Sequence, residues 1–334
     1  MLKTKITEAF GLKTPIINAG MAFVAGPELA AAVANAGGLG MLGCGKTPPE
    51  GLRAMIQMTR TLTSGPFGVD LLAPFAEDGH VDVLIEQRVP LVVYFWGLPS
   101  QDQVQRLKAG NVRVWMQVGS VAEARDAIAA GVETLIIQGS EAGGHNRAAA
   151  PLAQLLPAVR AALPDVPVVA AGGIINGQTM LAALALGAEA VWCGTRFLAS
   201  EEAAAHPAYK RRVVDAQPGD TEMTTVFGPE WPGQAMRVIA NAAVRRSRAR
   251  VDEALAEAEG DMIGTVAFGD VIVDVPRYSA ILPTREFNAD LDWACLTAGE
   301  CAGMIDAVLP AGDIVREMTA KALAIVERLT LRAA

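Results

Sequence analysis

Short apolar runs alternate with longer amphipathic segments through about the first 200 residues of the chain. Several runs are continuously hydrophobic and rich in valine and isoleucine, which is typical of parallel strands that are covered on both faces. Eight such runs occur, at residues 15–18, 39–42, 67–71, 91–95, 112–117, 134–138, 166–170 and 190–193. The pattern therefore predicts eight buried parallel strands.

The segments between these runs carry apolar residues at helical spacing, most clearly at residues 28–35, 121–130 and 177–186. A glycine follows each of these three segments within two residues, and glycine commonly lies just past the C-terminus of a helix. Repeated strand–helix units indicate an α/β fold. Because the units number eight, we expect a closed (β/α)8 TIM barrel, with an open doubly wound sheet as the alternative.

The repeating pattern ends near Ser200. Residues 201–309 contain helical tracts at 205–216 and 233–259, separated by a loop rich in proline and glycine. An amphipathic segment at residues 314–330 then resembles a final helix that returns to the barrel. We therefore expect a TIM barrel formed by residues 1–200 and 310–334, and a smaller, mainly helical second domain at 201–309 that caps the active site. Candidate aromatic walls of that site are Trp96, Phe227 and Trp231.

Composition and charge exclude several classes of protein. The chain has 36 acidic against 28 basic residues and a net charge of −8, which argues against nucleic-acid binding. No apolar stretch reaches the roughly 18 residues of a membrane span, and the N-terminus lacks the pattern of a signal peptide, so we expect a cytoplasmic protein. Three histidines and four cysteines without zinc-like spacing predict no metal site.

In a TIM barrel the functional residues lie at the C-terminal ends of the strands. Glycines gather after the seventh and eighth predicted strands, at Gly172, Gly173 and Gly194. Glycine lets a backbone approach a ligand closely, so this arrangement predicts a phosphate-binding cradle. His145 follows two glycines in the loop after the sixth strand. A histidine with an ordinary pKa near neutrality is suited to proton transfer.

Other catalytic groups are scarce at these ends. No lysine lies at a strand end, which argues against a Schiff-base enzyme. Asp70 and Glu141 are the only clear carboxylates, which weakens a magnesium site or a two-carboxylate glycosidase. A phosphate cradle with one histidine favours a cofactor that supplies the chemistry, and FMN fits. The alternative of a different class is a flavin-free isomerase with Glu141 as its base.

The segment at residues 138–145, Gln-Gly-Ser-Glu-Ala-Gly-Gly-His, closely resembles the signature of the nitronate monooxygenase family. Residues 15–21, 170–174 and 194–197 are similar to the family as well, and the likeness extends over nearly the whole chain. The family also includes FMN-dependent enoyl-ACP reductases and NADH:quinone reductases. The resemblance implies an FMN-binding barrel with a small second domain.

Carried over position by position, the resemblance implies that His145 is the catalytic residue. It also implies a set of residues around FMN, from its ring to its phosphate. With the residues at the other strand ends, the predicted cofactor-binding set is Ala19, Gly20, Met21, Asp70, Gln117, Gln138, Gly143, Gly144, Gly172, Gly173, Cys193, Gly194 and Thr195.

The chain departs from the family pattern at three positions. Asp70 stands where the family usually has asparagine, and Gln117 stands where a lysine is common. A carboxylate facing the flavin would change its electronics or need a raised pKa to stay neutral, unless it only accepts a hydrogen bond from an N–H group. Asn146 and Arg147 follow the histidine where the family often has a glycine within two residues. Arg147 is either a solvated loop arginine or a contact to an anionic substrate or to the phosphate of a nicotinamide cofactor.

These residues predict an FMN-dependent nitronate monooxygenase, which oxidises alkyl nitronates with O2 to a carbonyl compound and nitrite. The alternative is an NAD(P)H-dependent FMN reductase that acts on a quinone or an enoyl thioester. A flavin-binding protein without turnover is a further candidate. The expected partners are a small-molecule substrate, O2 and, for the reductase, NAD(P)H, with a homodimer as a candidate assembly.

Overall fold

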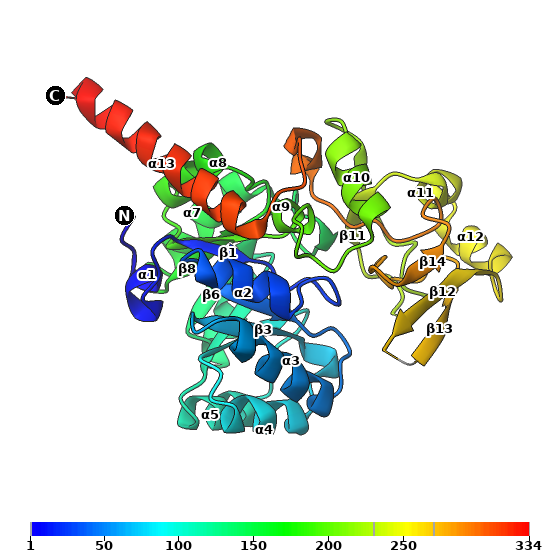
Figure 1. Ribbon diagram of the computed structural model, residues 1–334, viewed down its shortest axis with the longest axis horizontal. Helices are drawn as coiled ribbons and strands as arrows, with labels where there is room; N and C mark the ends of the chain where they lie inside the picture. Colours follow the sequence, from blue (N-terminus) through cyan, green and yellow to red (C-terminus); the bar gives the residue numbers. More distant parts are fainter. Residues whose placement is uncertain (1, 230, 270, 334) are drawn as a thin grey trace.

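The computed structural model describes residues 2–229, 231–269 and 271–333. Its core is an eight-stranded parallel sheet with the order β1-β9-β8-β6-β5-β4-β3-β2, surrounded by helices (Figure 1). Each strand lies within two residues of a predicted one. The strands are β1 (Ile16–Asn18), β2 (Gly40–Gly43), β3 (Phe67–Leu72), β4 (Leu91–Phe95), β5 (Arg113–Val118), β6 (Thr134–Gln138), β8 (Val168–Ala171) and β9 (Ala190–Cys193).

The two end strands of this order, β1 and β2, meet and close the sheet into a barrel. Ile17 and Leu39 form a parallel bridge, and the N–H of Leu39 donates to the carbonyl of Ile16 at 3.0 Å. The side chain of Asn18 adds two hydrogen bonds to the backbone of Met41, each 2.9 Å long. An open sheet would leave both edges unpaired, so the TIM barrel is confirmed and the doubly wound alternative is wrong.

Helices cover the outside of the barrel. The last of them, α13, packs against α8 and α2, so the chain end returns to the barrel, and the predicted helices at 28–35, 121–130, 177–186 and 314–330 all exist. The covering helices are α2 (Pro27–Asn35), α3 (Pro49–Leu62), α4 (Asp78–Glu86), α5 (Gln101–Ala109), α6 (Val121–Ala129), α7 (Leu152–Ala162), α8 (Gly177–Ala185) and α13 (Ala311–Ala333).

Alternate strand residues fill the inside of the barrel, and a short helix, α1 (Lys5–Phe10), packs on them. The ring of Phe10 makes an edge contact with the ring of Trp115, with centroids 5.6 Å apart. Because α1 packs near the beginnings of the strands, the space left inside the barrel lies at their C-terminal ends. This is the end at which TIM-barrel sites are found.

Residues 201–309 form a lateral extension of the barrel, on the side away from the two chain ends (Figure 1). The expectation of a mainly helical segment is wrong, because five strands accompany its helices. The strands are rich in β-branched residues, which favour extended structure. The extension contains α10 (Pro207–Asp215), β10 (Thr221–Thr224), β11 (Met236–Ile239), α11 (Ala242–Ser247), α12 (Val251–Glu257), β12 (Met262–Phe268), β13 (Val271–Pro276) and β14 (Phe287–Ala289).

The strands of the extension form two small antiparallel sheets. One has the order β13-β12-β14. The other, β10-β11-β7, includes the two-residue strand β7 (Gly144–His145), which belongs to the loop after β6 of the barrel. The loop that carries His145 is therefore hydrogen-bonded to the extension.

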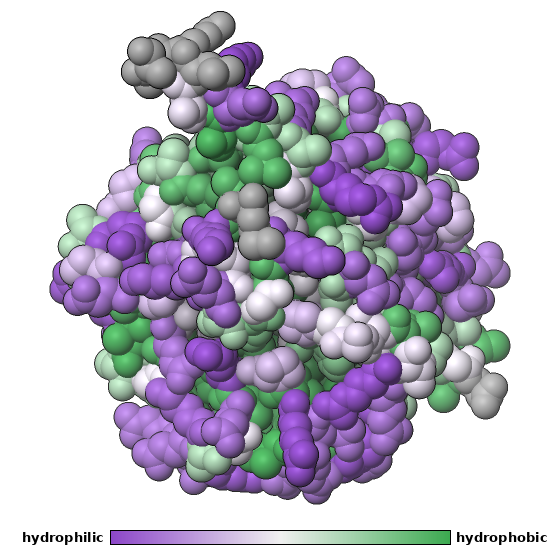
Figure 2. All heavy atoms as spheres, turned by 60° about the vertical axis from the view of Figure 1, so that its left-hand side comes forward, coloured by the Kyte–Doolittle hydropathy of each residue, from purple (hydrophilic) through white to green (hydrophobic). Residues whose placement is uncertain are grey.

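The face of the molecule on the side of the two chain ends is mostly hydrophilic, with apolar residues in scattered patches (Figure 2). The longest helix, α13, has 23 residues and carries charged residues along its length. Among the described residues, no helix combines the length and the apolar character that a bilayer span requires.

Gly177, the first residue of α8, lets α13 pack closely against the barrel. A Cβ atom at Gly177 would lie 2.5 Å from the nitrogen of Ala322 and 2.6 Å from the carbonyl oxygen of Met318. We expect Gly177→Ala to lower the free energy of unfolding by about 1–3 kcal/mol, because α13 must shift to accept the methyl group. Urea unfolding followed by circular dichroism measures this change.

Gly312→Ala is the matched control, because a Cβ there meets only the guanidinium end of Arg316, at 3.2 Å. This flexible group moves easily, and alanine is the better helix former, so stability should stay the same or rise by up to about 1 kcal/mol. Equal losses in both variants would contradict the close packing of α8 against α13.

Candidate active site

A cavity of about 620 Å³ lies at the C-terminal ends of the barrel strands, a volume within the range of small-molecule sites. It brings together all of the predicted site residues except one. The predicted residues that line it are Ala19, Gly20, Met21, Asp70, Gln117, Gln138, Gly143, Gly144, His145, Gly172, Gly173, Gly194 and Thr195.

Cys193 is the exception, and its assignment to the cavity is corrected. Side chains of neighbouring strand residues point to opposite faces, and on β9 it is Trp192 that lines the cavity. Cys193 is 1% exposed and packs in the apolar layer that includes the helices. Burial raises the pKa of its thiol, so the group stays a neutral core side chain.

The glycines after β8 and β9, which were predicted to form a phosphate-binding cradle, line the cavity. Gly172 and Gly173 have φ angles of +114° and +68°, in the left-handed region that other residues adopt at a cost. Within the described residues, the backbone N–H groups of Gly173 and Gly194 have no acceptor. Both glycines line the cavity, so two donors remain for an anionic ligand.

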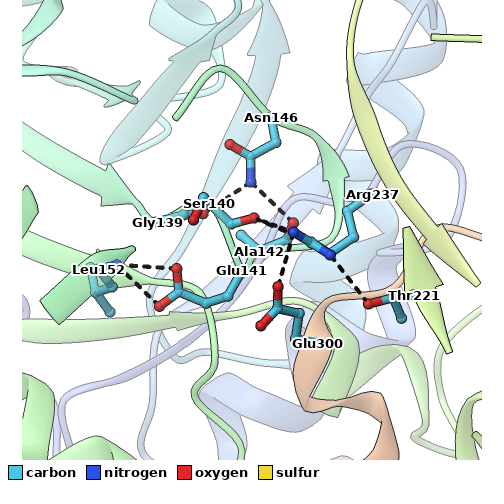
Figure 3. Close-up of polar contacts among 9 residues, drawn as sticks. All are labelled: Gly139, Ser140, Glu141, Ala142, Asn146, Leu152, Thr221, Arg237 and Glu300. Carbon is cyan, nitrogen blue, oxygen red and sulfur yellow. Dashed lines mark hydrogen bonds and ion pairs between the residues drawn. The ribbon is translucent and has the colours of Figure 1, made fainter. Parts of the chain in front are cut away.

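Glu141 lies behind this cradle and outside the set of cavity-lining residues. Both of its carboxylate oxygens accept a hydrogen bond from the N–H of Leu152 at 3.1 Å, at the beginning of α7 (Figure 3). Its carbonyl accepts from the N–H of Glu300 at 3.0 Å. Glu141 therefore caps a helix and ties loops together, and it is not placed to act as a base in the cavity.

Arg237 of β11 holds the loop after β6 from the side of the extension. Its Nε and Nη2 atoms donate to the carbonyl of Ser140 at 3.2 and 3.1 Å. Its Nη2 also forms an ion pair with Glu300 at 3.0 Å, and Nη1 donates to the hydroxyl of Thr221 at 3.5 Å (Figure 3). The guanidinium is largely buried, whereas the Glu300 side chain is 57% exposed, so solvent and salt reach the ion pair from the Glu300 side.

Asn146 holds the same loop from inside. Its Nδ2 donates to the carbonyls of Gly139 and Ala142 at 2.9 and 3.1 Å (Figure 3). Its Oδ1 accepts from the N–H of Ala148 at 2.8 Å. With Asn146 and Arg237 satisfying three loop carbonyls, the segment that carries His145 has one defined shape.

His145 projects into the cavity from β7. Met236 of β11 is its antiparallel partner, and the Nε2 of Gln138 donates to its carbonyl at 3.0 Å. Its ring clusters with those of Trp96 and Trp231, at centroid distances of 5.1 and 5.2 Å, and the two tryptophan rings are 5.5 Å apart. Burial lowers the pKa of His145 from 6.5 to about 4. This corrects the expectation of an ordinary histidine: near neutral pH the imidazole is uncharged, with one donor and one acceptor nitrogen.

The two tryptophans belong to an aromatic cluster that the sequence only partly indicated. Trp231 lines the cavity and makes an edge contact with Phe75, which also lines it. Trp96 has a left-handed φ of +64°, and its Nε1 donates to Oε1 of Gln234 at 2.7 Å. Phe227 lies elsewhere, in the core of the extension. The extension thus contributes one wall of the cavity.

Two cations lie near this cluster. Lys46, in the loop after β2, lines the cavity and holds its ammonium 4.5 Å from the centre of the Phe75 ring. Sequence reasoning missed it as a site residue, although its loop follows a barrel strand. Arg147 pairs with Glu123 at 2.8 Å and stacks near Trp96, so it is engaged outside the cavity.

Asp70, Gln117 and Gln138 form a polar part of the lining, and each is at most 9% exposed. No hydrogen bond to the carboxyl group of Asp70 exists within the described ranges. Burial raises its pKa well above the usual value of 3.8. Within the same ranges, no cluster of three or more His, Cys, Asp or Glu side chains is arranged to hold a metal ion.

The family model described as nitronate monooxygenase matches residues 3–80 and 75–321 of the chain. A curated relative from Staphylococcus aureus, named probable nitronate monooxygenase, is 31% identical over 304 residues, which are 78% of this chain and 82% of the relative. The fold and the site define an oxidoreductase built on a TIM barrel. The chain belongs to the nitronate monooxygenase family.

Another relative is (3aS,4S,5R,7aS)-5-hydroxy-7a-methyl-1-oxo-octahydro-1H-indene-4-carboxyl-CoA dehydrogenase from Rhodococcus jostii. It is 42% identical over 202 residues, which are 60% of this chain and only 56% of the relative's own length. Among solved structures, FabK from Thermotoga maritima is 33% identical with a TM-score of 0.83, and 99% of both chains are covered. Nitroalkane oxidase from Streptomyces ansochromogenes is 28% identical with a TM-score of 0.78, covering 97% of this chain and 99% of that one.

The lowered pKa of His145 is directly measurable. In NMR spectra recorded over a pH series, we expect the His145 ring to remain neutral as the pH falls and to take up its proton near pH 4, because the buried site disfavours the charged form. His145→Gln assigns the signal, since His80 and His206 remain. A midpoint at or above 6.5 would show that the ring is exposed to solvent.

Proposed function

We propose that the protein is an FMN-dependent oxidoreductase that oxidises alkyl nitronates with O2 to a carbonyl compound and nitrite. The observation that carries this proposal is one cavity that combines two free backbone N–H donors, at Gly173 and Gly194, with a neutral histidine on the loop after β6. The two N–H donors suit a phosphate, and the neutral histidine suits an anionic substrate.

The residues present fit FMN in three respects. The glycine cradle offers donors and space for a phosphate. Ala19 and Met21 give an apolar surface for the flat ring. Asp70, Gln117 and Gln138 give the polar groups that the edge of the ring requires. When bound there, FMN would supply the electron transfer from the substrate to O2.

His145 orients the substrate in this proposal. A neutral imidazole donates one hydrogen bond, and in a site with little water such a bond to an anionic oxygen is strong. Because the pKa of His145 is lowered to about 4, the ring is a weak base. The site is thus better suited to a nitronate that arrives as an anion than to a neutral nitroalkane whose proton must be removed.

A second candidate is a reductase that takes its electrons from NAD(P)H. Two similarities favour it: the near-complete structural match to FabK and the identity with the Rhodococcus CoA dehydrogenase. Lys46 at the cavity also offers a cation for a phosphate-bearing substrate. The flavin-free isomerase has no comparable support, since Glu141 is engaged at the beginning of α7.

The deciding experiment uses the visible spectrum of the purified protein. Without oxygen, an alkyl nitronate is added to one sample, and NADH or NADPH to another. Rapid bleaching by the nitronate alone supports the proposed oxidation. Rapid bleaching by the nicotinamide, with the nitronate inert, indicates the reductase. A protein that stays colourless after incubation with FMN rejects both, and a yellow protein that neither donor bleaches is a flavin-binding protein without turnover.

His145→Ala should lower kcat by about 10²-fold or more, because the reacting anion loses a positioned hydrogen-bond donor. FMN should stay bound, since the histidine lies on the loop after β6 and not on the glycine cradle. Steady-state oxygen consumption and the flavin absorbance measure the two effects separately. His206→Ala, at the beginning of α10, is the control and should keep full kcat.

Gly194→Ala tests the cradle. Its added Cβ would have only one neighbour within 4 Å, the Cβ of Ala19 at 3.6 Å, so the variant should fold normally. The methyl group would nonetheless occupy space beside the anion donors, and we expect FMN to bind at least about tenfold more weakly. Fluorescence titration with FMN gives the Kd. Unchanged affinity would mean that the phosphate lies elsewhere, and Gly312→Ala serves as the control.

A further inference from the structure

Asp70 is a carboxyl group held at the cavity without a hydrogen-bond partner. It lies on β3, lines the cavity and is only 8% exposed. Within the described residues, neither of its oxygens accepts a hydrogen bond or pairs with a cation. Buried polar groups in proteins are nearly always satisfied. A carboxyl that remains open towards a ligand cavity therefore indicates a partner that the ligand supplies.

The position of this carboxyl is set by the loop after β1. A Cβ atom at Gly20 would lie 2.1 Å from Cβ of Asp70 and 2.5 Å from its Oδ2. The side chain is therefore packed directly against the backbone of Gly20. Ala19 and Met21, on either side, also line the cavity, so Asp70 stands beside the surface proposed for the flavin ring.

Among the residues that the structure describes, no charged group pairs with this carboxyl. From the loop after β2, Cys44 faces it, and burial raises the pKa of that thiol, so the thiol is neutral. Lys46 of the same loop directs its ammonium over Phe75 instead. The loop after β1 contributes residues 19–21, which have no titratable side chain, and on β4 the partner of Asp70 is Val93.

In such surroundings the protonated acid is the stable form. An isolated carboxylate loses its hydration on burial and gains nothing in return, so its pKa rises, as the burial of Asp70 leads one to expect. A neutral carboxyl has one O–H donor and one carbonyl acceptor, whereas a carboxylate has only acceptors. The neutral group thus resembles an amide in its hydrogen bonding.

We propose that Asp70 is a proton-linked ligand of the flavin. In its neutral form, the carboxyl donates one hydrogen bond to the polar edge of the bound ring and accepts another from it. FMN therefore binds the form of the protein in which Asp70 carries its proton. This inference rests on the proposed function, since it assumes that FMN occupies the cavity.

Linkage gives the sign of the pH dependence. At pH values where Asp70 is neutral before binding, affinity does not depend on its proton. Above the pKa of the free protein, binding must take up one proton at Asp70, so affinity falls by up to tenfold for each pH unit. A carboxylate that only accepted a hydrogen bond would give the opposite trend, with affinity rising as the pH rises.

The experiment compares the wild type with Asp70→Asn over about pH 7 to 9.5. An amide keeps one donor and one acceptor but cannot ionise. FMN binding to the apoproteins is followed by the quenching of flavin fluorescence. The ratio of the two Kd values cancels pH effects common to both proteins, such as the titration of FMN itself.

Asp126→Asn is the control, because Asp126 is exposed on α6 and does not line the cavity. We expect the wild-type Kd to rise relative to that of Asp70→Asn by up to tenfold per pH unit, and Asp126→Asn to follow the wild type. A wild-type Kd that instead falls relative to that of Asp70→Asn as the pH rises, as an ionised Asp70 that only accepts a hydrogen bond would give, overturns the role of Asp70 alone.

Calorimetry on the wild type keeps the test independent of how the variant folds. Titrations with FMN in buffers of different ionisation enthalpy report the protons taken up on binding. Uptake that increases towards one proton as the pH is raised supports the proposal, and release of a proton on binding overturns it, because it shows that FMN binds the ionised carboxylate. A wild type that binds no FMN at any pH overturns the proposed function, and this inference with it.

Discussion

The antiparallel pairing of β7 with β11 is the interaction on which the site depends. A barrel alone presents its strand ends to water, and the loop after β6 would be one loop among several. Pairing of His145 with Met236 attaches this loop to the extension, and Arg237, the next residue of β11, binds its carbonyl at Ser140. The same strand thus covers the barrel end and positions the histidine. The cavity exists because these two parts of the chain share backbone hydrogen bonds.

Covering the barrel end has an electrostatic consequence. The most deeply buried groups that face the cavity become poorly hydrated, which disfavours their charged forms. Burial lowers the pKa of His145 and raises that of Asp70, so a base and an acid both shift towards their neutral forms. The cavity thus offers a ligand directional hydrogen bonds from poorly hydrated side chains and backbone N–H donors. Such an environment suits the planar ring of the proposed FMN.

The barrel was predictable from the sequence because its signals are local and repeated. Each strand is a short apolar run, and most site residues follow a strand end directly. Three features were not predictable in the same way. Cys193 is the neighbour of the cavity-lining Trp192, but its side chain points to the opposite face of β9. The apolar run itself does not show which of its residues face the cavity. The strands of the extension pair across long separations, such as β7 with β11. Burial lowers the pKa of His145, and the rings of Trp96 and Trp231 that pack against it come from distant segments.

The seam between β1 and β2 has a bearing on how the molecule opens. There the parallel ladder is reduced to the bridge between Ile17 and Leu39, and the amide of Asn18 substitutes for further backbone pairs. Regions with few backbone bonds separate first in local unfolding. The barrel therefore has a preferred line of opening, and that line ends at Ala19, on the edge of the cavity. A ligand that packs against Ala19 would stabilise the closed seam. It would thereby raise the protection of the backbone amides of β1 and β2 from hydrogen exchange, although it touches few of them.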